Sequence, residues 1–336
     1  MSILFTKPSF NLSRRDVVAM KPYPLQFKPV LKQTIWGGRL LGERLGKPIG
    51  DESDYAESWE VVDHGVDQSV VTSGHLEGKT LKDLLTEHNE WLMGDAANDH
   101  FPLLLKYLDC NRVLSVQVHP TDEYGATMPV PDLGKTEAWY IVDAKPGSVI
   151  YAGLKKGVDA SALRAAVEEG RAEEVLHQFE AKPGDCVFIP AGTVHAIGAG
   201  LLVAEIQQSS DTTFRLYDWN RTDASGKGRE LHIEQSIEVT DFERGPVAPI
   251  RADESADGWQ TLVECDKFRL RAISNGSDTV GGDNRFHIIT VPQGKATLVT
   301  DSERINLTAG NSILLPAAHD AVTLELENDS LVLTMT

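Results

Sequence analysis

Two histidines, one glutamate and one glutamine stand at spacings that could bring them around a single cation. Gln117 and His119 are separated by one residue of a short apolar run, so in a strand they lie on the same face. Glu137 begins another strand-like run eighteen residues beyond His119, and His195 opens a third. Two imidazoles, a carboxylate and an amide suit zinc and leave coordination positions open. The sequence therefore predicts one Zn²⁺ per chain, held by these four residues.

The residues before His195 form a turn that would deliver it to the inside of a barrel. Gly184 suits a turn into a strand, and Pro190 and Gly192 suit a tight reversal before the next strand. The pattern resembles the second conserved motif of the cupin superfamily, G-x5-P-x-G-x2-H, at each defined position. A buried histidine alone is more often a core residue than a ligand. The prediction of a metal site therefore depends on the four residues together.

Most of the chain consists of short apolar runs punctuated by Gly, Pro, Asp and Asn, which favours a sandwich or barrel over alternating strands and helices. Two stretches have helical spacing instead: one opened by Thr80 with Asp83 as a capping carboxylate, and one over residues 159–179, interrupted near Gly170. We predict a mainly β fold of double-stranded β-helix (cupin or jelly-roll) barrels with a few peripheral helices. The predicted strands include residues 113–118, 138–142, 148–151, 186–189 and 201–207.

A shift in composition over residues 245–259, rich in Pro, Asp and Glu, predicts a linker. The spacing from Gly184 to Pro190 recurs from Gly310 to Pro316, which indicates a duplicated, bicupin-like barrel. The second copy lacks the correctly spaced His, so we expect it to bind no metal. The predicted units are a disordered extension at 1–19, a metal-binding catalytic domain with helical insertions at 20–245, and a degenerate cupin-like β domain at 258–336.

The formal charge of −18 would repel the phosphates of nucleic acid and an anionic membrane surface, so neither is an expected partner. A small anionic substrate would need a locally positive pocket. The three cysteines are widely spaced and sit in or beside apolar stretches, as free thiols in a reducing compartment do. No apolar run has the length of a membrane span. We expect a cytoplasmic protein that is a monomer or a weak homo-oligomer.

From residue 23 to about residue 238 the chain resembles the type I mannose-6-phosphate isomerases in their shorter bacterial form. The matching segments are 36–38, 57–60, 116–120, 134–137, 190–195 and 207–219. In that family Gln, His, Glu and His hold zinc, and these map onto Gln117, His119, Glu137 and His195. General cupins more often have His at the first position, so Gln117 favours the isomerase. The resemblance implies interconversion of mannose 6-phosphate and fructose 6-phosphate through an enediol.

The resemblance also implies roles for further residues. Arg215, Lys135 and Glu205 match positions implicated in the family's catalysis, and Arg221 and Asp218 are weaker candidates for substrate binding. Glu205 lies in the apolar run 201–206, where a carboxylate needs a partner. Either Lys135 or Glu205 could be the general base. Arg215, Lys135 or Arg221 could anchor the phosphate, and the sequence does not choose among them.

Two other functions fit the same scaffold. One is a metal-dependent cupin oxygenase with redox-active iron, against which Gln117 and the match around Arg215 both argue. The other is a non-catalytic sugar-binding cupin that has kept the fold and lost the chemistry. It is disfavoured because every mapped functional position is filled.

Overall fold

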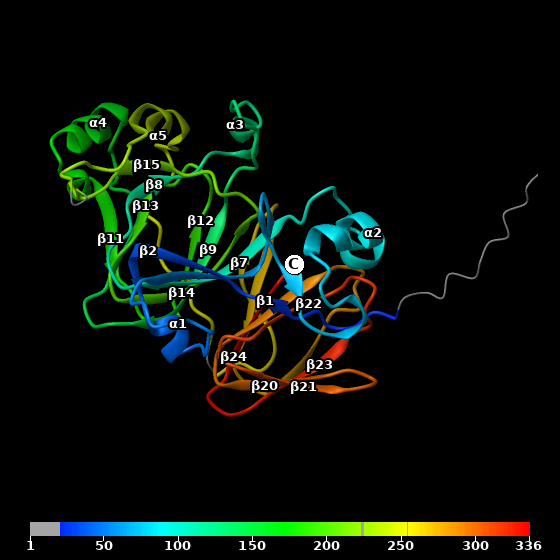
Figure 1. The fold of residues 1–336 in the computed structure, drawn as a ribbon. Coiled ribbons are helices and arrows are strands. Elements are labelled where there is room, and N and C mark those ends of the chain that lie inside the picture. Colours follow the sequence, from blue (N-terminus) through cyan, green and yellow to red (C-terminus); the bar gives the residue numbers. More distant parts are fainter. Residues whose placement is uncertain (1–20, 223–224, 254) are drawn as a thin grey trace, which may run out of the picture.

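The computed structural model describes residues 21–222, 225–253 and 255–336, and its main strands form four antiparallel sheets (Figure 1). The predicted extension at 1–19 lies outside the described residues. Strands up to residue 217 form the two sheets of an N-terminal barrel, and strands from residue 260 onward form the two sheets of a C-terminal barrel. The predicted mainly β, cupin-like architecture is therefore confirmed.

The N-terminal barrel pairs a six-stranded sheet with a five-stranded sheet, and apolar side chains from both fill the space between them. The larger sheet, in the order β12-β9-β14-β7-β3-β2, consists of β2 (Val30–Gly38), β3 (Tyr55–Val61), β7 (Leu103–Cys110), β9 (Glu137–Ala144), β12 (Cys186–Ile189) and β14 (Leu201–Gln208). The smaller sheet, in the order β11-β10-β13-β8-β15, consists of β8 (Val116–Val118), β10 (Val149–Leu154), β11 (Leu176–Glu180), β13 (His195–Ile197) and β15 (Phe214–Tyr217). Two short ribbons add β1 (Phe27–Lys28) with β6 (Val70–Val71), and β4 (Asp63–His64) with β5 (Asp67–Gln68).

The C-terminal barrel repeats this arrangement with a five-stranded and a four-stranded sheet around a second apolar core. The first, in the order β16-β17-β24-β19-β22, consists of β16 (Gln260–Glu264), β17 (Arg269–Ile273), β19 (His287–Gln293), β22 (Ser312–Leu315) and β24 (Leu331–Met335). The second, in the order β18-β23-β20-β21, consists of β18 (Ser277–Val280), β20 (Lys295–Val299), β21 (Arg304–Thr308) and β23 (Val322–Leu326).

The helices lie outside the barrels, with α4 and α5 side by side at one end of the N-terminal barrel and α2 at its other side (Figure 1). They are α1 (Leu40–Glu43), α2 (Leu81–Met93), α3 (Asp122–Gly125), α4 (Ala160–Glu168), α5 (Ile233–Val239) and the 3₁₀ turns η1 (Gly74–Leu76) and η2 (Ala172–Glu174). The predicted start of α2 is confirmed, since Thr80 and Asp83 form a reciprocal capping box. Within the described residues, the helices are too short or too polar to cross a membrane.

The second predicted helix is only half right. Asp159 caps α4 by accepting from the Ala162 N–H, but the helix ends at Glu168 and Gly170 adopts a left-handed φ of 69°. Residues 176–179, predicted as helical, belong to strand β11 (Leu176–Glu180) instead. The free edge of β10 supplies hydrogen bonds to this segment, with Leu154 opposite Leu176. Sheet pairing here outweighs the helical spacing of the apolar residues.

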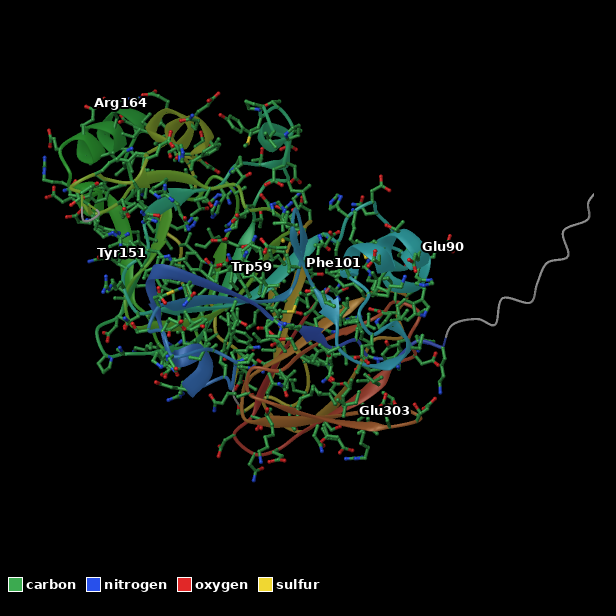
Figure 2. All side chains as sticks on the ribbon, in the orientation of Figure 1. Trp59, Glu90, Phe101, Tyr151, Arg164 and Glu303 are labelled. Carbon is green, nitrogen blue, oxygen red and sulfur yellow. The ribbon has the colours of Figure 1, made fainter. Side chains whose placement is uncertain are left out.

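The two barrels share one continuous apolar core. Phe101, just before β7, packs on Phe286, just before β19, with ring centroids 4.7 Å apart and both side chains buried. Figure 2 shows Phe101 near the middle of the molecule among crowded side chains, whereas Glu90 and Glu303 project from its edge. The C-terminal barrel is therefore packed directly against the six-stranded sheet of the N-terminal barrel.

Buried polar groups also join the barrels. The Lys47 ammonium lies 2.6 Å from Glu60 Oε1 and donates to the Gly310 carbonyl at 2.5 Å. Tyr107 and Thr290 share a hydrogen bond of 2.6 Å between their hydroxyl oxygens. Side chains alternate along β7, so Tyr107 faces the C-terminal barrel while its neighbour Lys106 faces the opposite side of the sheet. One face of the six-stranded sheet thus contacts the C-terminal barrel, and its opposite face lies toward a cavity.

Replacing Lys47 by Met leaves the Glu60 carboxylate buried without its cation. We expect Lys47→Met to lower the free energy of unfolding by about 3–5 kcal/mol, measured by urea denaturation. Adding Glu60→Gln should recover part of the loss, and Lys295→Met, which removes an exposed lysine, should have almost no effect. A loss below about 1 kcal/mol for Lys47→Met would contradict the assignment.

Candidate metal centre and substrate cavity

Three of the four predicted metal ligands lie together inside the N-terminal barrel. His119 directly follows β8, Glu137 begins β9 and His195 begins β13. Their ligand atoms all lie within 4.8 Å of one another, and all three residues are buried. Glu137 places one oxygen 3.5 Å from His119 Nε2 and the other 3.4 Å from His195 Nε2. The arrangement is a compact group of two imidazole nitrogens and a carboxylate.

Gln117, the fourth predicted ligand, lies next to this group. It is the partner of His195 in the antiparallel pairing of β8 with β13, and directly opposed residues point to the same face of a sheet. Its side chain lines the cavity that adjoins the three ligands. The register therefore places Gln117 next to His195 across the two strands.

Both imidazoles are in the form that binds a metal. The Nδ1–H of His195 donates to the Thr193 carbonyl at 2.8 Å, and that of His119 donates to the Thr212 carbonyl at 3.0 Å, which leaves each Nε2 with a lone pair. Burial, together with the positive charge of the nearby Lys135 ammonium, lowers the pKa of His195 to about 3. The same two causes hold the pKa of His119 well below its ordinary value. Neutral imidazoles are metal ligands at pH 7.

The group also has hydrogen-bonding capacity that the described residues leave unused. His195 Nε2 and Glu137 Oε1 are buried without a hydrogen-bond partner in the described part of the chain. Such groups cost about 1–3 kcal/mol each unless something binds them. The Lys135 ammonium already donates to His119 Nε2 at 3.1 Å and to Glu137 Oε2 at 2.5 Å. This place attracts an ammonium group and has two further acceptors that no described residue uses. It therefore fits a divalent cation.

Glu205, predicted to need a partner in its apolar strand, has two. Its Oε1 lies 3.1 Å from Lys106 Nζ and 3.6 Å from Lys135 Nζ. Lys106 stands opposite Glu205 in the pairing of β7 with β14, and its Nζ lies 3.4 Å from Glu57 Oε2. Burial opposes its charge, but Glu205, Glu57 and Glu137 outweigh that effect and raise the pKa of Lys106. A buried network of alternating charges therefore extends from the ligand group.

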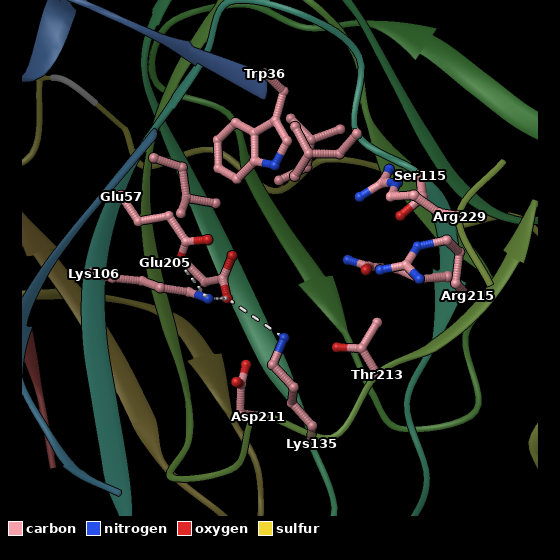
Figure 3. Close-up of a pocket in the computed structure, with 14 residues that line it drawn as sticks. Trp36, Glu57, Lys106, Ser115, Lys135, Glu205, Asp211, Thr213, Arg215 and Arg229 are labelled. Atoms are coloured by element: carbon pink, nitrogen blue, oxygen red, sulfur yellow. Dashed lines mark ion pairs between the residues drawn. The ribbon is translucent and has the colours of Figure 1, made fainter. Parts of the chain in front are cut away.

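A cavity of about 340 Å³ opens beside this network, within the usual size range of small-molecule sites. Figure 3 shows Arg215 and Arg229, with Ser115, on one side of it and Glu57, Lys106 and Glu205 on the other. The lining residues are Trp36, Glu57, Lys106, Leu108, Leu114, Ser115, Gln117, Lys135, Ile197, Glu205, Asp211, Thr213, Arg215 and Arg229. All three residues predicted to be catalytic are among them.

The two predicted substrate-binding residues occupy a different position. Arg221 donates to Asp218 and, at 2.7 Å, to the Val113 carbonyl, and neither Arg221 nor Asp218 is among the described residues that line the cavity. Asp218 also accepts hydrogen bonds of 2.8 and 2.5 Å from Arg229. Unlike Arg221, Arg229 lines the cavity. The pKa of Arg215 is lowered by burial and by the positive charge of Arg229. Two cations thus meet at one end of the cavity.

Sequence reasoning gave no role to two of these cations. Lys106 is a lone lysine in the apolar run Leu-Leu-Leu-Lys-Tyr-Leu. A single charged residue in an apolar run is the signal that indicated Glu205, and the same signal indicates Lys106. Arg229 has no comparable signal, because it lies in the polar segment Gly-Lys-Gly-Arg-Glu and reaches the cavity only through the fold. Ser115, Thr213 and Asp211 stood within or next to matched segments but had no assigned part.

Two packed jelly-roll barrels with an imidazole–carboxylate group inside the first define a protein of the cupin class.

A model of the type I phosphomannose isomerase catalytic domain matches residues 25–152. Mannose-6-phosphate isomerase ManA of Bacillus subtilis (strain 168) is 40% identical over 300 residues, which cover 88% of this chain and 94% of that protein. Mannose-6-phosphate isomerase of Streptococcus mutans serotype c (strain ATCC 700610 / UA159) is 37% identical over 297 residues, covering 87% and 92%. The crystal structure of the mannose 6-phosphate isomerase from Bacillus subtilis matches with a TM-score of 0.84 at 33% identity, covering 93% of this chain and 99% of that one. The chain therefore belongs to the type I phosphomannose isomerase family.

The ligand group should hold one divalent ion per chain, which mass spectrometry of the dialysed protein can measure. We expect Glu137→Gln and His195→Ala each to reduce the bound metal by about tenfold or more, because the first removes the only negative charge among the three ligands and the second removes an imidazole donor. Glu123→Gln, which changes an exposed carboxylate on α3, is the matched control and should keep the wild-type metal content. Undiminished metal in both ligand variants would contradict the site.

Proposed function

We propose that this chain interconverts mannose 6-phosphate and fructose 6-phosphate through an enediol, with Zn²⁺ as its metal. Membership of the family supports the reaction. The observation that supports it most within the structure is a single cavity lined by a lysine–glutamate pair and two arginines, whose lysine, Lys135, also contacts the buried ligand group. Isomerisation needs a proton removed from carbon 2 and returned to carbon 1, and stabilisation of the charge that builds on the carbonyl oxygen. The cavity offers a group for each need.

His119, Glu137 and His195 would hold the ion, with Gln117 as the proposed fourth ligand. Zinc suits two neutral imidazoles, a carboxylate and an amide, since nitrogen and oxygen donors of this kind are its usual ligands. When bound, the ion supplies a Lewis acid that stabilises negative charge on the sugar oxygens. The hydrogen bonds from the two Nδ1–H groups to the Thr193 and Thr212 carbonyls fix the direction in which both Nε2 atoms point.

Lys135 and Glu205 are the proposed proton-transfer residues. Lys135 Nζ lies between the ligand group and Glu205, with 3.6 Å to Glu205 Oε1, so both side chains reach the same part of the cavity. One of them takes the proton from carbon 2 and returns it to carbon 1, while the hydroxyl proton passes from oxygen 2 to oxygen 1. Lys106 holds the Glu205 carboxylate from the opposite side and keeps it oriented.

Arg215 and Arg229 are the proposed anchors of the phosphate. Both line the cavity at the side remote from Glu57 and Lys106, and each lies close enough to the other for its charge to matter. A phosphate placed between them would relieve the repulsion of two guanidinium groups and accept hydrogen bonds from both. Asp218 takes the supporting part, since it holds the Arg229 guanidinium in place, whereas Arg221 binds Asp218 from outside the cavity.

A coupled assay on mannose 6-phosphate tests the reaction and both alternatives. We expect activity that a chelator abolishes, that added Zn²⁺ restores, and that is unchanged without oxygen. Dependence on oxygen and iron would favour the cupin oxygenase. Binding of the sugar phosphate with no turnover by the zinc-loaded protein would favour the non-catalytic sugar-binding cupin.

Replacing Arg229 tests the phosphate assignment. We expect Arg229→Met to raise the KM for mannose 6-phosphate by about tenfold or more with a smaller effect on kcat, because a charged hydrogen bond to the substrate is lost. Arg221→Met is the matched control, since Arg221 binds the same Asp218 from outside the cavity, and its KM should stay within about twofold of wild type. Equal increases in the two variants would show that Arg229 does not contact the phosphate.

A further inference from the structure

A lysine from the C-terminal barrel reaches the catalytic domain next to the site. Lys267, in the turn between β16 and β17, places its Nζ 2.8 Å from Asp122 Oδ2 on α3. The turn is fixed, because the Phe268 side chain is buried with its ring centroid 6.5 Å from that of Phe188 in β12. In addition, the Cys265 N–H donates to the Phe268 carbonyl at 3.1 Å. Lys267 is therefore presented to Asp122 from a rigid support.

Asp122 also binds the segment that carries Lys135. Its second oxygen, Oδ1, accepts from the Gly134 N–H at 2.7 Å and from Gln208 Nε2 at 2.9 Å. The Gln208 amide oxygen in turn accepts from the Thr136 N–H at 3.0 Å. The two backbone amides on either side of Lys135 are thus held, directly and through Gln208, by one carboxylate.

The segment has little freedom to move without breaking these contacts. A Cβ atom at Gly134 would lie 2.5 Å from the Asp122 backbone nitrogen, so only glycine permits this close approach to α3. The backbone N–H of Lys135 donates to the Pro120 carbonyl at 3.0 Å, which ties it to the residue after His119. A small shift of Asp122 would therefore be transmitted to Lys135 and Glu137.

We propose that Lys267 is a positioning residue, which acts through Asp122 to hold the backbone around Lys135 in its catalytic geometry. The inference rests on the proposed function of Lys135 and deepens it, since it gives the C-terminal barrel a part in the reaction. Hydrogen bonds from Lys267, Gln208 and Gly134 outweigh burial and lower the pKa of Asp122, so the carboxylate is charged at neutral pH and attracts the ammonium. Misplacement of a catalytic group by a fraction of an ångström slows chemistry more than it weakens binding.

The test compares three variants by steady-state kinetics and by hydrogen exchange at the Gly134 and Thr136 amides. We expect Lys267→Met to lower kcat on mannose 6-phosphate by about threefold to tenfold, with KM within about twofold of wild type, and to speed exchange at both amides. Lys267→Arg should restore both readouts. Lys295→Met, which removes an exposed lysine of the same barrel, should change neither. Unchanged kcat and exchange in Lys267→Met, or equal changes in Lys295→Met, would overturn the proposal.

A double variant separates positioning from a general loss of stability. Asp122→Asn keeps Oδ1 as an acceptor for Gly134 and removes the charge that Lys267 binds, so adding Lys267→Met to it should have no further effect on kcat or on exchange. A full additional loss would show that Lys267 acts by another route and would overturn the proposal. Wild-type protein without isomerase activity would refute the proposed function instead, while exchange at the two amides would still decide whether Lys267 holds them.

Discussion

A charge buried away from water must be paired, and this constraint shapes the site more than any other. Lys106, Lys135, Glu137 and Glu205 are all almost completely buried, and each lies within 3.6 Å of an opposite charge. The pairing comes from strand register, since β14 sets Glu205 opposite Lys106 of β7. Two residues on, Gln207 stands opposite Glu137 of β9. Shifting one strand by a residue would turn these side chains to the opposite face and leave their partners uncompensated.

The same pairing connects the candidate metal ligands with the two proposed proton-transfer residues. The Glu137 carboxylate is shared between the Lys135 ammonium and the place where a divalent ion would bind, and two cations compete for one carboxylate. The other acidic partner of Lys135 is Glu205, on the cavity side. Lys135 therefore contacts a carboxylate of the candidate ligand group on one side and the Glu205 carboxylate on the other. The two proposed proton-transfer residues would then act as one unit beside the substrate.

Much of the fold could be predicted from the sequence, because strand alternation and turn chemistry are local properties. Residues 186–189 and the capping box at Thr80 were predicted at the positions where they occur. The prediction was wrong at residues 176–179, where the edge of β10, more than twenty residues earlier, provides hydrogen bonds that a local pattern cannot reveal. Helical spacing and a partly buried edge strand are similar over so few residues.

For the site, the sequence by itself determined which candidate donors can share a face. Residue type and side-chain phase suffice to place Gln117 and His119 on one face, and the turn before His195 is encoded by adjacent residues. Only the tertiary structure decided which charges surround that set: Lys106 opposite Glu205, Arg229 in the cavity where Arg221 was expected, and Lys267 beside Asp122. The reason is physical. A ligand pair within a strand is fixed by backbone geometry, whereas an ion pair between distant segments depends on register and on the docking of two barrels, which no local spacing specifies.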